Sequence, residues 1–186
     1  MNDKPQTSRG GDAALPPDCR QVTQGVAFFD LSRMAEWASS QDDERVAAML
    51  QDFYCLAAAR MTGAGGRVVK FIGDAGLVVF SREAAERVIF ALAELSSEVH
   101  RLAASHGFNT FLNTNVHFGP MVEGSFGPPG QERYDVLGKS VNIAARLGRR
   151  GLNLSQQAFR CLGAEARARF DKIESPVTYR FKEPGS

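Results

Sequence analysis

The sequence has few cysteines, no long apolar run and almost no net charge. Its three cysteines, Cys19, Cys55 and Cys161, are widely spaced and form no CxxC pair. We therefore expect no disulfide framework and a reducing, cytoplasmic location. No apolar run approaches the ~18 residues that span a bilayer, which predicts no membrane association. The formal net charge is +1, so electrostatics gives no reason to expect nucleic acid as a partner.

Several familiar site signatures are missing as well. His100, His106 and His117 do not have the spacing of metal ligands. The glycine-rich residues 63–67 lack the GxxxxGK[ST] phosphate loop, and we interpret them as the end of a helix. The Gly-Gly-Asp/Glu-Glu-Phe hairpin is also absent, which disfavours a diguanylate cyclase or a palm-type polymerase.

The pattern that is present predicts one domain behind a polar tail. Residues 1–20 are rich in Gly, Pro and Asp and show no periodicity, so we expect them to be disordered. Residues 21–186 have the length and apolar content of a single domain.

The elements expected in that domain alternate between strands and helices. Strands are predicted at 25–31, 67–72, 77–80, 111–118 with a continuation through 121–125, near Asn153 and Lys172, and at 177–181; helices are predicted at 32–39, 42–62, 82–105, 141–149 and up to about residue 168. This order is that of an α+β fold of the ferredoxin-like split βαβ type. It predicts an antiparallel-rich sheet flanked by helices, with the helices on one face.

Two acids stand at strand ends in this arrangement. Asp30 ends the first apolar strand, and Asp74 lies at the tip of the 67–80 hairpin. The first strand and this hairpin are neighbours in a split βαβ sheet, so the two carboxylates can converge. A pair of carboxylates suits Mg²⁺ or Mn²⁺. Taken singly, a helix cap would explain Asp30 and a turn residue would explain Asp74.

A second polar constellation lies in the helix predicted at 141–149. Asn142 and Arg146 are four residues apart and therefore share one helix face. Such a pair can orient a ribose and neutralise charge at a phosphorus atom. The alternative is a solvated arginine and an asparagine at a helix start.

Three segments together resemble the catalytic domain of class III nucleotidyl cyclases, the adenylate and guanylate cyclases. Residues 28–31 (Phe-Phe-Asp-Leu) resemble their first metal-binding strand, residues 69–74 (Val-Lys-Phe-Ile-Gly-Asp) their lysine-and-metal hairpin, and residues 135–147 their ribose and transition-state segment. The order and spacing agree over residues 25–181. In its short length and its motifs the chain is most similar to the bacterial pyrimidine cyclases of Pycsar antiphage systems.

The resemblance implies a role for each matching residue. Asp30 and Asp74 would bind two divalent metal ions, Mg²⁺ or Mn²⁺. The backbone of Phe29, Leu31 and Ser32 would approach the phosphates of a nucleoside triphosphate, and Lys70 and Asp135 would read its base. Asn142 would orient the ribose and Arg146 would stabilise the α-phosphate. The family divides these residues between two subunits, which implies a homodimer with active sites at its interface.

The sequence also departs from the family pattern. Arg33-Met34-Ala35 replaces Gly-Phe-Thr, and the C-terminal Lys-Gly pair has only Lys172 as its nearest substitute, with help from Arg133. The base remains open, because a lysine donor and an aspartate acceptor suit adenine, cytosine or, in another pose, uracil. We favour UTP or CTP over ATP, with the hypothesis that Tyr54 or Trp37 shortens the pocket; ordinary core packing is the alternative for Tyr54. A catalytically inactive nucleotide-binding dimerisation module is the main rival of another class.

Overall fold

A computed structural model describes residues 15–148, 150–174 and 177–182. Its elements in chain order are β1 (Arg20–Leu31), α1 (Met34–Ala38), α2 (Asp43–Ala64), β2 (Gly66–Ile72), β3 (Ala75–Phe80), α3 (Ala85–Ser105), β4 (Leu112–Phe126), β5 (Arg133–Leu137), α4 (Lys139–Arg146), β6 (Leu152–Leu154), α5 (Gln156–Phe159), α6 (Ala164–Arg167), β7 (Phe170–Ile173) and β8 (Thr178–Phe181).

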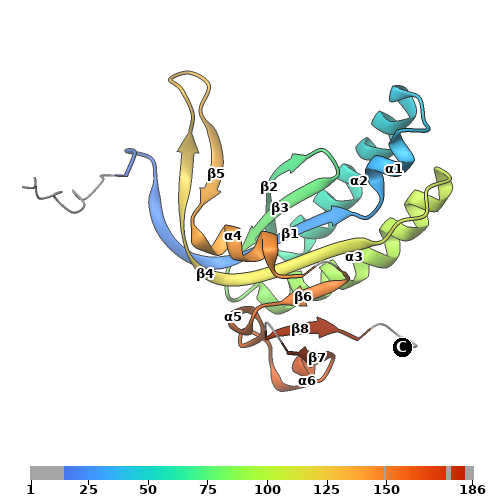
Figure 1. The fold of residues 1–186 in the computed structure, drawn as a ribbon. Helices are drawn as coiled ribbons and strands as arrows, with labels where there is room; N and C mark the ends of the chain where they lie inside the picture. Colours follow the sequence, from blue (N-terminus) through green and yellow to red (C-terminus); the bar gives the residue numbers. More distant parts are fainter. Residues whose placement is uncertain (1–14, 149, 175–176, 183–186) are drawn as a thin grey trace, which may run out of the picture.

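The strands form one eight-stranded sheet (Figure 1). The strand order is β2-β3-β1-β4-β6-β8-β7, and β5 pairs with β4 outside this path. Only the β4–β6 pairing is parallel among the described strands. The predicted α+β class, with an antiparallel-rich sheet flanked by helices, is confirmed.

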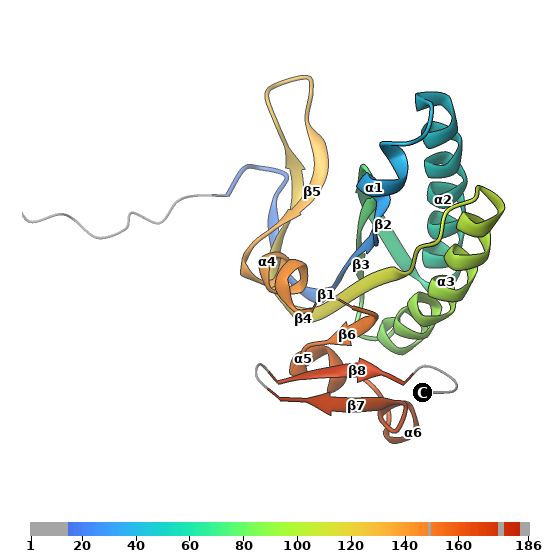
Figure 2. The same cartoon turned by 45° about the vertical axis from the view of Figure 1, so that its right-hand side comes forward.

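Helices cover both faces of this sheet, and the two layers are unequal. The long helices α2 and α3 lie together on one face, and the short helix α4 lies near β1 and β4 on the other (Figure 2). The reason is visible in β1, where Ala27, Phe29 and Leu31 enter the main core and Val26 enters a smaller core with Ala144 of α4. Because β1 is apolar on both sides, the expectation of helices on one face was incomplete.

Two glycines in β1 and β3 make room for aromatic rings of the opposite strand. Phe29 pairs with Gly76, and Gly25 pairs with Phe80. A Cβ on Gly76 would lie 2.3 Å from the Phe29 ring, and a Cβ on Gly25 would lie 2.1 Å from the Phe80 ring. Each ring therefore lies across the partner strand at a position that only glycine leaves open.

The largest difference from the predicted elements is a projecting two-stranded arm. The predicted continuation of the strand beyond Gly119-Pro120 is confirmed, and this part of β4 pairs with the unpredicted strand β5. Figure 1 shows the far part of β4 and β5 rising away from the rest of the sheet. The strand β1 also begins at Arg20, inside the predicted tail, and the helix predicted up to residue 168 is two short helices. Residues 1–14 and Arg149 lie outside the described residues.

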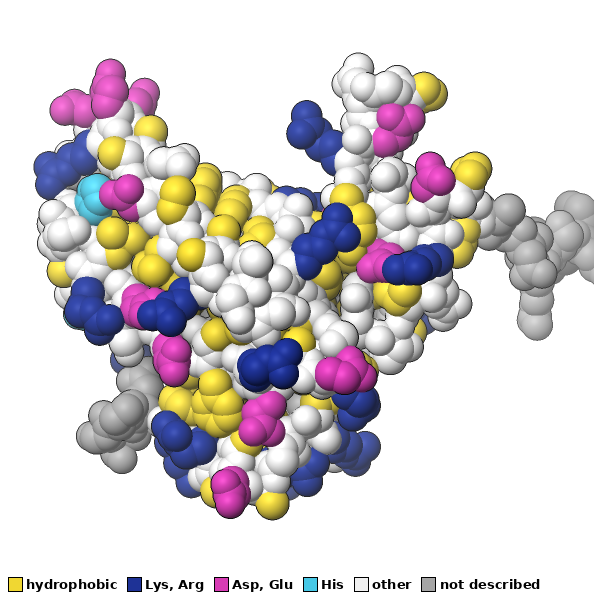
Figure 3. All heavy atoms as spheres, turned by 180° about the vertical axis from the view of Figure 1, so that it is seen from behind, with side chains coloured by type: hydrophobic (Ala, Val, Ile, Leu, Met, Phe, Trp, Pro, Cys, Tyr) yellow, Lys and Arg dark blue, Asp and Glu magenta, His cyan; other side chains and the backbone are white. Residues whose placement is uncertain are grey.

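The surface mixes charges of both signs. On the face in Figure 3, basic and acidic side chains are interspersed over the helical layer and the arm. Within the described ranges, no helix is long and apolar enough to cross a membrane.

Candidate active site

The first acid, Asp30, is positioned by strands on both sides. It lies opposite Ala75 of β3 and Asn113 of β4, and its side chain is half-buried. Asn113 Nδ2 donates to Asp30 Oδ2 over 3.1 Å and to Ser32 Oγ over 2.9 Å. The neighbours Phe29 and Leu31 point into the main core, so Asp30 points to the opposite face of the sheet, where α4 packs.

The second acid, Asp74, lies beside the first. Asp74 is in the turn between β2 and β3, and its carbonyl accepts the Leu31 N–H over 3.3 Å. The preceding residue, Gly73, has a φ of 58°, which glycine adopts readily. Tyr54 of α2 donates its hydroxyl to the Gly73 carbonyl over 2.5 Å. The structure therefore brings Asp30 and Asp74 together, as the strand order predicts.

The electrostatics of this pair suit a cation. Burial raises the pKa of Asp74, and the negative charge of Asp30 raises it further, against a backbone hydrogen bond that lowers it. Among the described residues, no group of three His, Cys, Asp or Glu side chains could hold a metal ion. Two neighbouring carboxylates fit Mg²⁺ or Mn²⁺, provided that backbone, water or phosphate oxygens supply the other ligands. Metal binding by this pair stays a prediction.

The segment expected to approach the phosphates is tied into the fold. Phe29, Leu31 and Ser32 are buried. The Leu31 N–H donates to the Asp74 carbonyl, and the Ser32 N–H donates to the Phe111 carbonyl over 3.0 Å. In this conformation both N–H groups already donate to carbonyl oxygens, so neither is available to a phosphate. The predicted contact of these residues with substrate stays a prediction.

The two residues expected to read the base contact each other. Lys70 of β2 donates to Asp135 Oδ2 of β5 over 2.5 Å, and Asp135 Oδ1 accepts the Val136 N–H over 2.8 Å. Both side chains are partly exposed, at 38% and 21%. A pocket opens beside them, and its lining is Val69, Lys70, Phe126, Gln131, Arg133, Tyr134 and Asp135.

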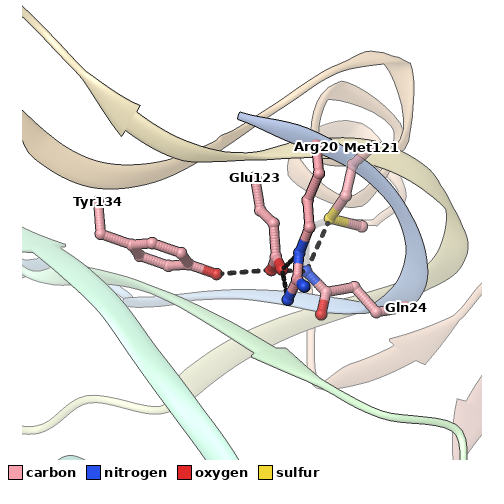
Figure 4. Close-up of polar contacts among 5 residues, drawn as sticks. All are labelled: Arg20, Gln24, Met121, Glu123 and Tyr134. Carbon is pink, nitrogen blue, oxygen red and sulfur yellow. Dashed lines mark hydrogen bonds and ion pairs between the residues drawn. The ribbon is translucent and has the colours of Figure 1, made fainter. Parts of the chain in front are cut away.

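A polar cluster at the base of the arm holds this pocket, and it was not predicted (Figure 4). Glu123 of β4 accepts from Arg20 over 2.7 Å, from Tyr134 over 2.9 Å and from Gln24 over 3.3 Å. Burial would raise the pKa of Glu123, but the bonds from Arg20 and Tyr134 outweigh it and hold the pKa below its ordinary value. On the other side of Tyr134, the Arg67 guanidinium lies 3.5 Å from the ring centroid. The cluster thus joins β1, β4 and β5 to β2.

The helix α4 displays the remaining pair outward. Its buried side is Ser140, which donates to the Pro120 carbonyl over 2.7 Å, and Ala144. Asn142 and Arg146 lie on the other side and are exposed. Within residues 15–148, 150–174 and 177–182, neither side chain has a hydrogen-bond or ion-pair partner. The structure therefore places them together, and it does not bring them to Asp30 within one chain.

The two bulky residues proposed to shorten the base pocket lie elsewhere. Tyr54 is on α2, stacked on Phe71 with ring centroids 4.3 Å apart, and it reaches the Asp74 turn. Trp37 is buried and stacks on Phe108 with centroids 4.9 Å apart. Neither lines the pocket beside Lys70, because Tyr54 lies on α2, which covers the opposite face of the sheet, and Trp37 of α1 is buried in the main core. This part of the base hypothesis was wrong for the pocket of the same chain.

Comparison with known proteins agrees with this fold and these residues. The profile of the "Adenylate and Guanylate cyclase catalytic domain" matches residues 18–176. This chain belongs to that family. Its members are class III nucleotidyl cyclases, which are lyases, and the predicted resemblance is confirmed at this level.

The chain is similar to curated proteins that are distant and much longer. Adenylate cyclase 1 of Rhizobium meliloti is 25% identical over 147 residues, which cover 74% of this chain and 21% of that protein. An uncharacterized protein of Mycobacterium tuberculosis is 29% identical over 131 residues, covering 66% of this chain and 23% of that protein. The cyclase chain thus spans less than a quarter of the length of these relatives.

Solved structures confirm the fold. The adenylyl cyclase CyaB from P. aeruginosa superimposes with a TM-score of 0.79 at 16% identity, covering 90% of this chain and 97% of that one. The guanylyl cyclase Cya2 gives a TM-score of 0.69 at 20% identity, with 90% and 97% coverage. These identities support the shared architecture and do not select a base.

Proposed function

We propose that two copies of this chain convert a nucleoside triphosphate to a 3′,5′-cyclic nucleotide and pyrophosphate. The observation that carries this proposal is the contrast between the convergent acids Asp30 and Asp74 and the outward pair on α4. Among the described residues of one chain, the two acids that would hold cations and the Asn–Arg pair that would contact the substrate lie apart. Antiparallel pairing of two copies would bring each half to the other.

In the proposed reaction the ribose 3′ oxygen attacks the α-phosphorus in line. The bond from that oxygen to phosphorus forms, the bond to the pyrophosphate oxygen breaks, and the proton of the 3′-hydroxyl passes to water. Bound Mg²⁺ or Mn²⁺ would supply Lewis-acid chemistry by lowering the charge on the phosphate oxygens. Asp30 and Asp74 would hold the cations. From the partner copy, Asn142 would orient the ribose and Arg146 would stabilise the charge that develops on the α-phosphate.

For the base we propose a pyrimidine, with adenine as the second candidate. Lys70 and Asp135 present one donor and one acceptor, and Phe126 and Tyr134 stand beside them in the pocket lining. Aromatic side chains can stack on a base of either size, so the choice of a pyrimidine rests on the resemblance to the Pycsar cyclases. The adenine alternative rests on the same donor–acceptor pair and on the likeness to an adenylate cyclase of Rhizobium meliloti. By the resemblance to Pycsar cyclases, we place the cyclic product in antiphage signalling.

The deciding experiment incubates the purified chain with ATP, GTP, CTP and UTP in turn, with Mn²⁺, and identifies the products by mass spectrometry. Cyclic UMP or cyclic CMP that is lost in Asp74→Ala would support the whole proposal. Cyclic AMP as the sole product would overturn the pyrimidine choice and leave cyclisation standing. Nucleotide binding by a dimer that releases no pyrophosphate from any substrate would favour the inactive module instead.

A further inference from the structure

Asn113 is a polar residue of β4 whose side chain lies on the face of the sheet opposite the main core. Its neighbours Leu112 and Thr114 are buried on the main-core side, at 1% exposure each. Asn113 faces the opposite side, directly across from Asp30 in the β1–β4 ladder. Its amide nitrogen donates to the Asp30 carboxylate and to the Ser32 hydroxyl. One side chain thus connects the first proposed metal ligand to the segment that follows it.

The other end of the same amide is poorly satisfied. Asn113 Oδ1 is buried, and no donor of the described residues reaches it. A buried carbonyl oxygen without a donor destabilises a fold, so Asn113 is a costly residue at this position. A leucine of similar size would remove that cost. The fold alone therefore does not explain why an amide stands here.

The orientation of the amide explains it. With Nδ2 toward Asp30, the amide donates to an acceptor that carries negative charge. The flipped amide would place Oδ1 against that carboxylate, where two oxygens repel each other. The contact to Asp30 therefore fixes the amide, and the amide in turn holds one oxygen, Oδ2, of the Asp30 carboxylate. Partners of this kind orient the ligands of metal sites.

We propose that Asn113 is a positioning residue for the divalent cation, acting through Asp30 and Ser32. It holds Asp30 Oδ2 by a hydrogen bond, which would leave Oδ1 of Asp30 to bind the cation. This inference rests on the proposed function, because it needs Asp30 to be a metal ligand. It adds a residue that raises metal affinity at the expense of stability.

The test measures Mn²⁺ binding directly, by the EPR signal of free Mn²⁺ during titration of the purified chain, together with the melting temperature. In Asn113→Leu we expect about 10-fold weaker Mn²⁺ binding, with an unchanged or higher melting temperature because the unsatisfied oxygen is gone. If Asn113 had only a structural role, the variant would bind Mn²⁺ as the parent does and would melt at a lower temperature.

Asn115→Leu is the matched control. Asn115 lies on the same strand and face, two residues away, and is buried. Its Nδ2 donates to the Gly148 carbonyl over 2.9 Å, and its Oδ1 accepts from Asn153. Both of its polar atoms have partners, and neither contacts Asp30. We expect this variant to melt at a lower temperature and to bind Mn²⁺ as the parent does.

A third variant, Asp30→Asn, separates this inference from the proposed function. If Asp30→Asn weakens Mn²⁺ binding but Asn113→Leu does not, the positioning role is wrong and the metal pair stands. If Asp30→Asn itself leaves Mn²⁺ binding unchanged, the metal pair is wrong and the inference fails with it. Weaker binding in both variants, with binding retained in Asn115→Leu, supports both statements.

Discussion

The polar side chains at the end of β1 and those on the outer face of α4 differ in how firmly the fold holds them. Asp30 and Asp74 are held by strand pairing, by an amide and by a tyrosine, so their positions are fixed before any substrate arrives. Asn142 and Arg146 are exposed on a helix whose other side is anchored. A fixed pair of acids and an outward Asn–Arg pair suit the proposed reaction, in which one copy would hold the phosphates and another would supply the transition-state contacts.

The sharpest way to break this comparison is to separate the two halves genetically. Asp74→Ala and Arg146→Ala should each lower cyclase activity by at least about 10³-fold, because charge neutralisation at the phosphate is the main catalytic contribution. Mixed in equal amounts and allowed to exchange subunits, the two inactive variants should recover about a quarter of the parent activity, since half of the dimers then contain one intact site.

Product formation after mixing is the measurement, and each variant mixed with itself is the control. If mixing restores nothing while mixed dimers are present by native mass spectrometry, both residues act from the same chain, and the division between β1 and α4 is wrong.

A smaller effect is expected from changing Asp135, one of the two residues proposed to read the base. Asp135→Asn removes the charge opposite Lys70 and leaves the Lys70 ammonium without its ion-pair partner. We expect a 10- to 100-fold loss of discrimination between the preferred nucleotide and the others, roughly the range for a mismatched binding contact. The ratio of kcat/KM values for the four nucleotides checks this. An unchanged ratio would mean that Lys70 and Asp135 only tie β5 to β2.

The Tyr54 hydroxyl tests how rigid the acid site must be. Tyr54→Phe keeps the stacking on Phe71 and removes only the hydrogen bond to the Gly73 carbonyl. We expect a loss of about 1 kcal/mol in the free energy of unfolding and a several-fold lower kcat at unchanged KM. Denaturant unfolding and steady-state kinetics measure the two. Phe71→Leu, which removes the stacking but keeps the hydroxyl, is the complementary variant.

The smallest effect concerns β4, the strand common to both regions. His117 is buried, burial lowers its pKa, and its Nδ1 lies 2.9 Å from Ser155 Oγ. Above about pH 6.5 the imidazole is neutral in the folded and the unfolded chain, so its contribution is fully present. As the pH falls below that value the unfolded chain binds the proton first, and stability should fall by up to about 1.4 kcal/mol per pH unit.

Melting temperatures between pH 5 and pH 7.5 test this, with His117→Gln as the control that should flatten the dependence. The same slope in parent and variant would assign the pH dependence to other groups.

Local patterns predicted the acid half of the site well. Asp30 follows an apolar strand and Asp74 lies in a Gly-Asp turn, so both positions follow from short segments and from the neighbour relation of a split βαβ sheet. Asn142 and Arg146 follow from helical spacing alone. Each of these depends on contacts that are close in sequence or fixed by the fold class.

The arm was not predictable in the same way. β5 forms because its residues pair with β4 across a loop, and its order depends on Glu123, Arg20 and Tyr134, which are far apart in sequence. The alternation of polar and apolar residues over 133–136, after the Gly-Pro-Pro-Gly turn, was the available signal. Asn113 gave little signal, because it stands beside other polar residues of the same strand and its partner Asp30 is 83 positions away.

The two ring-on-glycine contacts between β1 and β3 have a consequence for how this site can vary. Phe29 over Gly76 and Phe80 over Gly25 permit a single alignment of the two strands. Shifting that alignment by one residue would turn Asp30 toward the helical layer and bury it among Phe53 and Met49, with no change in composition. Gly25 and Gly76 have no chemical role of their own, yet they fix the strand register that keeps Asp30 on the face opposite the helical layer.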